Sequence, residues 1–527
     1  MGTYLNPGNE MFRAISRCDY VDKTGLIGLM NQRIETGGNL VCISRPRRFG
    51  KSYAAQMLAA YYDRSCDSHE LFDGKTICSN PTYEGHINKY DVIYIDITGI
   101  RPYTDKYRKI DSFLTEVLSE ELKSMYPDIK CGKDFASVLV DAVSVSGRKF
   151  IFIIDEWDAP VREADAETAD NYLKLLRSVF KNSVVTNRVV AAAYMTGILP
   201  IKKDGSQSAI SDFEEFTMIK PGMFGEYAGF TETEVRDLCA IKNIDFQSMK
   251  SWYDGYSLKN TGSIYNPNSV MKAIRNNDFD SYWTETSAAD SLMEYISKDY
   301  NGLARTIAEL IAGIDVPVET KGFSNDLTSF KGKDDVLTLL VHLGYLAYDH
   351  EKKTVHIPNE EIKLEFSRTI KVTDHSETLK RLSESERLFI DTVEENEESV
   401  AAQIEKIHSE ETAPLHYNSE ASLRSVIKLA YYTYRDNYVQ FEELPSGDGY
   451  ADIVYLPKYD SGYPILLIEL KWNKDVHTAI DQIKERHYPE QIKGFGRDII
   501  LVGITYDKDE KPGHRKHYCH IEKAVIE

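Results

Sequence analysis

Four short apolar runs between residues 39 and 200 constrain the fold of this 527-residue chain most strongly. They read LVCIS, VIYIDI, FIFIID and VVAAAYMTG, and helical stretches such as NYLKLLRSVFKN separate them. Short, continuous runs rich in β-branched residues that alternate with helices are typical of a parallel sheet buried on both faces. We therefore predict a multidomain α/β protein whose N-terminal part is a parallel sheet with helices on both faces.

The first of these runs leads into RPRRFGKS, where a strand gives way to a helix at Gly50-Lys51-Ser52. At such a junction, backbone N–H groups and the helix dipole attract phosphate. Lys51 is placed to reach the β- and γ-phosphates of ATP, and the Ser52 hydroxyl is placed to ligate Mg²⁺. The full phosphate-binding motif has glycine where this chain has Arg45, so the triplet alone is weak evidence.

Two carboxylates at the end of a later strand support the same interpretation. The run FIFIIDEWDAP ends its strand at Asp155-Glu156. We expect Asp155 to hold Mg²⁺ through water and Glu156 to polarise the attacking water. Thr196, at the end of the next strand, is a candidate sensor of the γ-phosphate, although a plain strand-ending threonine explains it equally well.

The segments DYVDKT, RPRRFGKS, IIDEWDAP, WYDGYS and YNPNSV resemble, in this order, the AAA-ATPase-like proteins of gut and anaerobic bacteria. The resemblance covers nearly the whole chain and implies a P-loop ATPase fused to a PD-(D/E)XK nuclease domain. In that family RPRRFGK commonly replaces the opening glycine. The resemblance thus implies a nucleotide-binding loop made of Arg45, Pro46, Arg47, Arg48, Phe49, Gly50, Lys51 and Ser52. Two roles stay open for the three arginines: neutralising phosphate, or packing and partner contacts.

The C-terminal part contains a second candidate site. Asp452 lies in the apolar run YADIVYL, and Glu469 and Lys471 lie in LLIELKW. Cleavage of a phosphodiester needs carboxylate oxygens to hold Mg²⁺ and a lysine to help activate water. Glu469 and Lys471 are two residues apart and share one face of their strand. These residues predict a metal-dependent nuclease centre, with a structural ion-pair cluster as the alternative.

Two further residues complete this second hypothesis. Glu420, which opens the preceding helix, is a candidate third metal ligand, although a favourable charge in a first helical turn explains it equally well. Gln482, on the helix after the Glu-x-Lys strand, falls where related nucleases carry a supporting polar residue. We therefore predict a restriction-endonuclease-like α/β domain at the C-terminus.

The order of these segments predicts five parts. A helical, aromatic stretch, interrupted by turn-rich segments, follows the first sheet. A helix with a short hairpin follows that stretch. The predicted parts are an AAA-like P-loop ATPase domain (1–215), a helical lid region (216–290), a winged-helix-like domain (291–382), a helical connector (383–411) and the nuclease-like domain (412–527).

Composition restricts the partners. The net charge of −20 opposes general binding of nucleic acid, so nucleic acid as the substrate depends on a local site. The seven scattered cysteines, with no C-x-x-C pair, fit free thiols in a reducing compartment. The chain shows no apolar signal core and no membrane-spanning run, which predicts a cytoplasmic protein without a membrane partner. A homo-oligomer stays open, since a neighbouring copy can supply an arginine to an ATP site.

The sequence thus favours an ATP-binding and ATP-hydrolysing protein with a Mg²⁺-dependent nuclease domain under nucleotide control. The first alternative is a nucleotide-switched binding protein whose nuclease-like domain does not cleave, and the second is an ATP-dependent enzyme that acts on protein. The Asp452 and Glu469-Leu470-Lys471 pattern favours the nuclease, because a purely binding domain has no chemical need of it. The overall acidity favours the alternatives.

Overall fold

The computed structural model describes most of the chain: 2–130, 132–201, 203–204, 207–208, 212–283, 315–321, 332–372, 376–411, 420–431, 438–446, 449–458, 463–473, 475–485, 498–506 and 516–524, with seven single residues between 210 and 330. It forms two compact units, which are described separately. The first comprises Met1–Asn301 and Val316–Glu365, and the second comprises Gly302–Asp315 and Phe366–Glu527.

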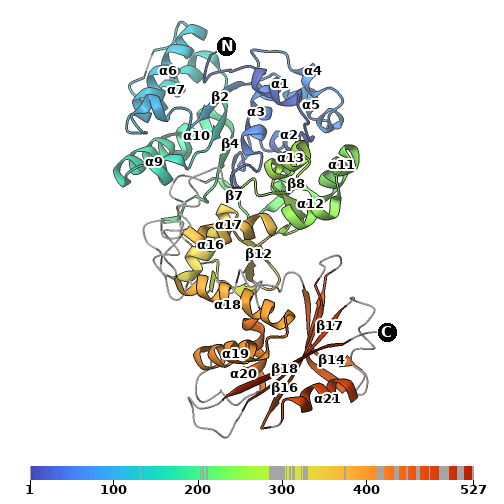
Figure 1. Ribbon diagram of the computed structural model, residues 1–527. Coiled ribbons are helices and arrows are strands. Elements are labelled where there is room, and N and C mark those ends of the chain that lie inside the picture. The colour runs from blue at the N-terminus through green and yellow to red at the C-terminus, as the bar shows by residue number, and fades with distance from the viewer. Residues whose placement is uncertain are drawn as a thin grey trace. The chain divides into compact units, whose positions relative to one another are not determined.

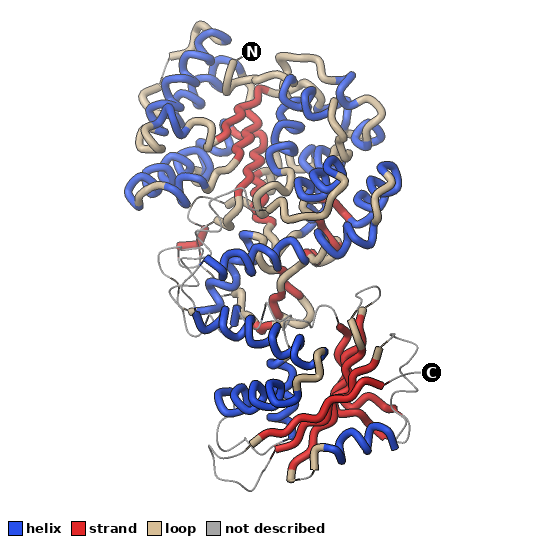
Figure 2. Tube along the Cα trace, viewed as in Figure 1, coloured by secondary structure: helices blue, strands red, loops and turns tan. Residues whose placement is uncertain are grey.

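A five-stranded parallel sheet forms the centre of the first unit, as the four apolar runs predict (Figures 1 and 2). The strand order is β2-β3-β4-β1-β7. The residues of β1, β2, β3 and β4 are divided between two separate hydrophobic cores, one on each face of the sheet, and β7 contributes Phe216 to one of them. The strands are β1 (Leu40–Ser44), β2 (Asp91–Asp96), β3 (Phe150–Asp155), β4 (Val190–Gly197) and β7 (Glu214–Phe216).

Helices cover both faces of this sheet (Figure 1), because β1 to β4 present apolar side chains on both sides. One face is covered by α1 (Glu10–Ser16), α2 (Gly25–Asn31), α3 (Lys51–Tyr62), α4 (His69–Phe72), η1 (Thr76–Ser79) and α5 (Tyr83–His86). The other face is covered by α6 (Ile110–Met125), α7 (Phe135–Ser146), α9 (Ala166–Phe180) and α10 (Ser183–Val189). The short elements η2 (Arg101–Thr104), α8 (Ala159–Glu163), β5 (Lys203–Asp204) and β6 (Gln207–Ser208) lie in the connections.

The chain after the parallel sheet is mainly helical with small antiparallel sheets. Polar caps begin its helices: Thr231 and Glu234 form a reciprocal capping box at α11, and Asn266 caps α13 ahead of a proline. The elements are η3 (Gly222–Tyr227), β8 (Phe230–Thr231), α11 (Glu232–Lys242), α12 (Phe246–Tyr253), β9 (Tyr256–Leu258), β10 (Gly262–Tyr265), α13 (Pro267–Asn276), β11 (Val316–Pro317), α16 (Lys333–Leu343), β12 (Ala347–Asp349), β13 (Thr354–His356) and α17 (Glu360–Val372). The winged-helix-like assignment and the predicted domain limits stay predictions.

The second unit is built on a mixed five-stranded sheet in the order β14-β15-β16-β17-β18. Only the β16–β17 pair is parallel. This mixed α/β sheet agrees with the predicted C-terminal fold class. Its elements are α18 (Ser376–Val393), α19 (Glu397–Glu411), α20 (Glu420–Ala430), β14 (Tyr438–Ser446), β15 (Gly449–Pro457), β16 (Ile465–Trp472), α21 (His477–Glu485), β17 (Ile499–Tyr506) and β18 (His517–Ala524).

Two buried histidines meet in the core of the second unit. Nδ1 of His408, on α19, lies 2.9 Å from Nε2 of His517, on β18. His517 also stacks on Tyr506 with a centroid distance of 5.1 Å. Burial, with a smaller contribution from His408, lowers the pKa of His517 to about 3. An unfolded histidine titrates near pH 6.5, so as the pH falls the unfolded state takes up this proton before the folded state does.

We therefore expect the second unit to lose stability as the pH falls from about 6.5 towards 3, with a slope of up to ~1.4 kcal/mol per pH unit. Hydrogen exchange of the β17 and β18 amides, corrected for intrinsic rates, measures this slope. His517→Phe keeps the ring packing and removes the titrating group, so its slope should be smaller. Equal slopes in the wild type and the variant would contradict the assignment.

Two predictions about the whole chain concern thiols and membranes. Six of the seven cysteines lie in the described part of the chain, and all six are free thiols. Cys131 lies outside the described residues. Among the described helices, none combines the length and the apolar character that a membrane crossing requires.

Candidate functional site

The loop between β1 and α3 closes around the side chain of Lys51. Gly50 has a φ of 81°, a conformation that suits glycine because it has no Cβ, and α3 begins directly after it. The Lys51 ammonium donates hydrogen bonds to the carbonyl oxygens of Arg45 (3.1 Å) and Pro46 (2.9 Å). The side chain is only 3% exposed. The loop therefore presents a buried cation at the N-terminus of a helix, as a phosphate site requires.

Arg45 is completely buried beside this loop. Its guanidinium donates to the carbonyl oxygens of Ser44 and Phe216, and burial lowers its pKa to about 10. The side chain thus anchors the end of β1 to β7. Of the two roles that the sequence left open for this arginine, this position favours packing over direct contact with phosphate.

The other loop residues fix the loop against later parts of the first unit. The Arg48 guanidinium donates to the carbonyl oxygen of Tyr282 at 2.8 Å, and Arg47 is half-buried. Phe49 is buried and packs edge-to-face on Tyr256, with a centroid distance of 5.5 Å. Side chains of this loop therefore contact neighbouring segments and hold the loop in place. A glycine-rich loop has no side chains that could make such contacts.

Pro46 packs against the turn that follows α16. Gly344 in this turn has a φ of 86°, and a Cβ added there would lie 2.8 Å from ring atoms of Pro46. The turn also accepts a hydrogen bond, from the Tyr256 hydroxyl to the Gly344 carbonyl oxygen at 2.6 Å. Residues distant in sequence therefore support the loop.

Asp155, Thr196 and Ser52 meet at the carboxyl ends of β3 and β4 and the start of α3. The Thr196 hydroxyl donates a short hydrogen bond to Oδ1 of Asp155, and the Ser52 hydroxyl is also bonded to this carboxylate. Burial raises the pKa of Asp155. A buried carboxylate next to a serine hydroxyl is a set of oxygen donors that suits Mg²⁺.

Glu156 lies between two basic side chains. Its backbone has a φ of 52°, which is uncommon for a residue with a Cβ. Oε1 of its carboxylate lies 3.7 Å from the Lys51 nitrogen, and Oε2 lies 3.3 Å from Nη2 of Arg162. Burial raises the pKa of Glu156, and the two cations oppose this effect. The carboxylate can accept a proton close to the phosphate loop.

The sequence did not indicate Arg162 or Asp158. Asp158 is fully buried, and its Oδ2 accepts hydrogen bonds from the backbone N–H groups of Ile198 and Leu199 and from Arg162. Asp158 and Arg162 are four residues apart at the start of α8, and this spacing in DAPVR was the available signal. The pair fixes the cation that contacts Glu156.

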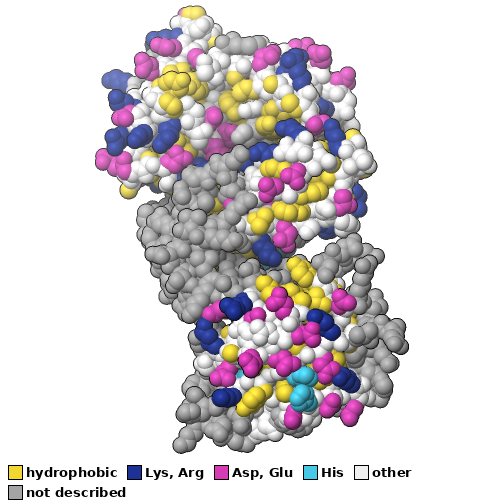
Figure 3. Space-filling model, viewed as in Figure 1, with side chains coloured by type: hydrophobic (Ala, Val, Ile, Leu, Met, Phe, Trp, Pro, Cys, Tyr) yellow, Lys and Arg dark blue, Asp and Glu magenta, His cyan; other side chains and the backbone are white. Residues whose placement is uncertain are grey.

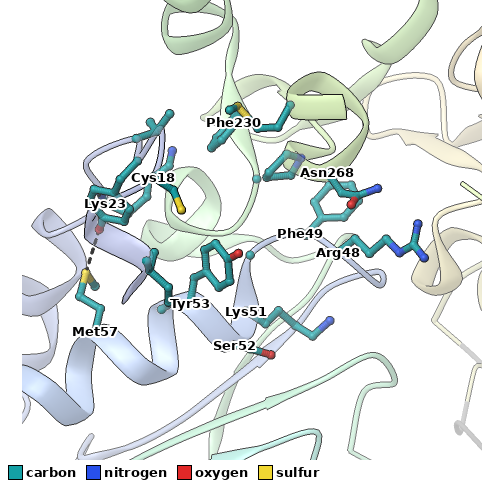
Figure 4. Close-up of a pocket in the computed structure, with 18 of the residues that line it drawn as sticks. Cys18, Lys23, Arg48, Phe49, Lys51, Ser52, Tyr53, Met57, Phe230 and Asn268 are labelled. Carbon is teal, nitrogen blue, oxygen red and sulfur yellow. Dashed lines mark hydrogen bonds between the residues drawn. The ribbon is translucent and has the colours of Figure 1, made fainter. Parts of the chain in front are cut away.

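A cavity of about 480 Å³ opens beside the phosphate loop (Figure 4). Lys51, Ser52, Glu156 and residues from the segments 19–23 and 267–275 line it. Figure 4 shows that Tyr53, Phe49, Phe230 and Asn268 border the same space. Its apolar side chains include Ile15, Val21, Met57, Phe230 and Met271, and its polar ones include Lys23, Asn268, Lys272 and Arg275.

No role was predicted for these additional lining residues, although several of them lie in or beside the segments DYVDKT and YNPNSV. Local hydrogen bonds fix both segments. The Asp22 carboxylate accepts from the N–H groups and hydroxyls of Thr24 and Thr76, and the Asn266 side chain accepts from the N–H of Asn268. These two segments were the sequence signal that could have identified one side of the cavity.

The second site lies where β15 and β16 separate. Their pairing stops at Ile453 and Ile468, and one residue further Oδ2 of Asp452 accepts a hydrogen bond from the N–H of Leu470 at 2.8 Å. At this point the Asp452 carboxylate accepts a β16 hydrogen bond that a backbone carbonyl of β15 would accept in a continuous strand pair. The two strands therefore place the carboxylates of Asp452 and Glu469 next to each other.

The Glu469 carboxylate contacts two other residues predicted for this site, Lys471 and Gln482. Its Oε1 accepts hydrogen bonds from the Lys471 ammonium (2.8 Å) and from the Gln482 amide on α21. The residue is 1% exposed, and its Oε2 is buried without a hydrogen-bond partner. Burial and the neighbouring Asp452 raise the pKa of Glu469. An unpartnered carboxylate oxygen beside a second carboxylate fits a divalent cation.

The third predicted metal ligand is Glu420. The side chain of Glu420 lies outside the described residues. Nη2 of Arg424, one turn further along α20, lies 3.7 Å from Oδ1 of Asp452. Over the described parts of the chain, no group of three or more His, Cys, Asp or Glu side chains is arranged to hold a metal ion. Among the described residues, the candidate ligands at this site are thus Asp452 and Glu469.

Comparisons with known proteins match a family model to each of two parts of the chain. Residues 8–206 match the model of the predicted AAA-ATPase family, and residues 418–513 match that of the PD-(D/E)XK nuclease superfamily. A protein of Azotobacter chroococcum mcd 1, described as an uncharacterized protein in the vnfD 5′ region, is 27% identical over 304 residues. The match covers 55% of each chain, so this chain spans about half the length of that relative. A Walker-type ATPase of Pyrococcus abyssi aligns at 13% identity and a TM-score of 0.33, over 66% of this chain and 96% of its own.

Proposed function

The chain carries a domain of the predicted AAA-ATPase family and a domain of the PD-(D/E)XK nuclease superfamily, and on this premise we propose an ATPase that controls a metal-dependent nuclease. The observation that carries the proposal is that four residues converge beside one cavity. Lys51, Ser52 and Glu156 line the cavity, and Asp155 is hydrogen-bonded to Ser52. The same set explains both binding and hydrolysis of a nucleoside triphosphate.

At the first site, each residue has a separate role. Lys51 exchanges its two loop carbonyl partners for the β- and γ-phosphates. Ser52 and Asp155 would hold Mg²⁺, which would neutralise phosphate charge during transfer. Glu156 accepts a proton from the attacking water, and Arg162 keeps its carboxylate in position. The cavity, at about 480 Å³, has the size of a small-molecule site, and we assign its apolar side chains, Val21, Met57 and Phe230 among them, to contact with the nucleotide base.

At the second site, the proposed reaction is hydrolysis of a nucleic-acid phosphodiester. Asp452 and Glu469 would hold Mg²⁺, which supplies an activated water and stabilises the developing charge. Lys471 is close enough to Glu469 to assist the attacking water, and Gln482 orients the same carboxylate. We propose that nucleotide occupancy at the first site controls cleavage at the second, which requires ATP to bind one arrangement of the protein more tightly than another.

A nucleotide-switched binding protein is the second candidate. The observation in its favour is that the described part of the second site provides two carboxylates, whose attraction for metal is opposed by Lys471 and Arg424. A nuclease-like domain without cleavage would recognise nucleic acid or a protein instead. We place the protein in the cytoplasm, and we include self-association among the arrangements that could complete the ATP site.

The variant Glu156→Gln tests the first site. We expect ATP affinity to stay close to that of the wild type, because Lys51, Ser52 and Asp155 remain. The hydrolysis rate should fall by about 100-fold or more, since the water loses its proton acceptor. Fluorescent-nucleotide titration and phosphate release measure the two quantities.

Glu167→Gln is the matched control, because Glu167 is an exposed carboxylate at the start of α9 and the charge change is the same. It should leave binding and hydrolysis unchanged. Full hydrolysis by Glu156→Gln would remove Glu156 from the proposed mechanism.

A further inference from the structure

An exposed basic loop follows β2 in the first unit. The segment Arg101–Lys109 contains four basic residues and one acidic residue. All four basic side chains are exposed, and so is Tyr103, at 70%. On the face shown in Figure 3, the basic and acidic side chains of the described residues are otherwise interspersed. Two of the four basic side chains of the loop lie near carboxylates, Arg101 at 3.6 Å from Glu163 and Arg108 at 3.7 Å from Asp165. Lys106 and Lys109 add exposed positive charge to the loop, in a chain with a net charge of −20.

The backbone of this loop has an unusual conformation. Asp105, Lys106 and Tyr107 have φ values of 50°, 54° and 77°, and residues with a Cβ rarely adopt such angles in succession. Strained backbone of this kind persists where the surrounding structure enforces it, and it occurs most often at functional sites. The strain alone does not identify the ligand, but it shows that the loop has a defined shape.

Two buried residues hold this shape from inside. Thr104 is fully buried, and its hydroxyl donates to the carbonyl oxygen of Ile100 at 3.0 Å. The N–H of Lys109 donates to the carbonyl oxygen of Thr104 at 2.9 Å, and Tyr107 is 1% exposed. The inward residues thus anchor the loop, while Tyr103, Lys106 and Lys109 are exposed to solvent.

A neighbouring aromatic ring supports the Tyr103 ring. Tyr103 stacks on Phe113 of α6 with a centroid distance of 6.1 Å and an interplanar angle of 9°. Phe113 in turn packs edge-to-face against Tyr4. Because the ring is fixed from below and 70% exposed, it forms a platform on which a flat group can stack.

We propose that the loop Arg101–Lys109 binds single-stranded nucleic acid. Lysine and arginine side chains next to an exposed, supported aromatic ring match a phosphate backbone that carries unpaired bases. The ring favours a single strand over a duplex, because the bases of a duplex already stack on one another. The choice of nucleic acid over an acidic protein rests in part on the proposed nuclease function.

A chain of ionic contacts connects this loop to the candidate ATPase site. Nε of Arg101 lies 3.6 Å from Glu163, and the Tyr107 hydroxyl donates to the same carboxylate at 3.4 Å. Glu163 also lies 3.6 Å from Arg162, the residue that contacts Glu156. A phosphate that takes Arg101 from Glu163 changes the charge next to Arg162. The same proposal therefore includes a response of ATP hydrolysis to bound strand.

Fluorescence anisotropy of a labelled single-stranded oligonucleotide with the full chain tests the binding. The buffer contains EDTA and no ATP, so the result depends on neither hydrolysis nor cleavage. We expect Tyr103→Ala to weaken binding by roughly 5- to 150-fold, the usual effect of losing one stacked base, and Tyr103→Phe to bind like the wild type. Lys106→Gln with Lys109→Gln should reduce the slope of log affinity against log salt by about 1.4.

The double variant Lys89→Gln with Lys220→Gln is the matched control, because both lysines are exposed outside the loop and the net charge changes equally. It should keep the salt slope of the wild type. The proposal is overturned if the wild type does not bind the oligonucleotide, or if the loop variants bind as tightly as the control. Competition by polyglutamate as strong as by oligonucleotide, with no effect of Tyr103→Ala, would identify an acidic protein partner and also overturn it.

Discussion

Lys51→Ala is expected to reduce the affinity for ATP by roughly 30-fold or more, because removal of one partner from a buried charged contact costs about 2 kcal/mol or more. Lys51 is the cation at the centre of the loop, and it is almost completely buried. Alanine leaves the phosphates without this partner. Titration with a fluorescent ATP analogue, in the presence of Mg²⁺, measures the change.

The control for this variant is Lys89→Ala, an exposed lysine in the same unit, which should bind ATP like the wild type. Lys51 also closes the loop through two carbonyl groups, so thermal unfolding of both variants must show that the first unit remains folded. ATP affinity equal to that of the wild type in folded Lys51→Ala would disprove the phosphate site.

At the second site, Asp452→Asn and Glu469→Gln are expected to abolish both divalent-metal binding and cleavage, because each removes the charge of a carboxylate ligand. Lys471→Ala should retain the metal, or bind it more tightly without a neighbouring cation, and still lose cleavage. None of the three should stop ATP hydrolysis. Calcium should support cleavage poorly in the wild type, because its longer and looser coordination positions water less well.

Calorimetric titration with Mn²⁺ and cleavage of end-labelled DNA and RNA measure these effects. Asp481→Asn, an exposed carboxylate on α21, is the matched control and should bind metal and cleave like the wild type. Cleavage that survives Glu469→Gln would show that another site, or another protein in the preparation, is responsible.

The sequence predicted the central strands of the first sheet from their apolar runs. The continuous runs FIFIID and VVAAAYMTG correctly indicated strands with two buried faces, because each face contributes to its own core. The first pair of candidate carboxylates lies at the end of β3, and the second pair lies within β15 and β16, where their pairing stops. The structure brings Asp155 next to Ser52 and Asp452 next to Glu469. The strand patterns and the family resemblance together were enough to propose these residues as candidates.

The sequence could not predict where long side chains point. Arg45, Arg47 and Arg48 are the same residue type and nearly adjacent in sequence. Arg45 is nevertheless buried against β7, while Arg48 contacts Tyr282. These directions depend on tertiary contacts between residues more than 150 positions apart. The role of Arg162 also depends on tertiary structure, because its contact with Glu156 requires the left-handed backbone at that glutamate.

The central claim, that ATP controls a nuclease, is tested most directly by one cleavage measurement. Purified wild type and Lys51→Ala are incubated with Mg²⁺ and end-labelled single- and double-stranded DNA and RNA, with ATP, with ADP or without nucleotide. The account predicts that ATP changes the cleavage rate of the wild type and leaves that of Lys51→Ala unaltered. A rate that is the same in all nucleotide conditions, or no cleavage of any substrate, would contradict it, and the latter result would favour a nucleotide-switched binding protein.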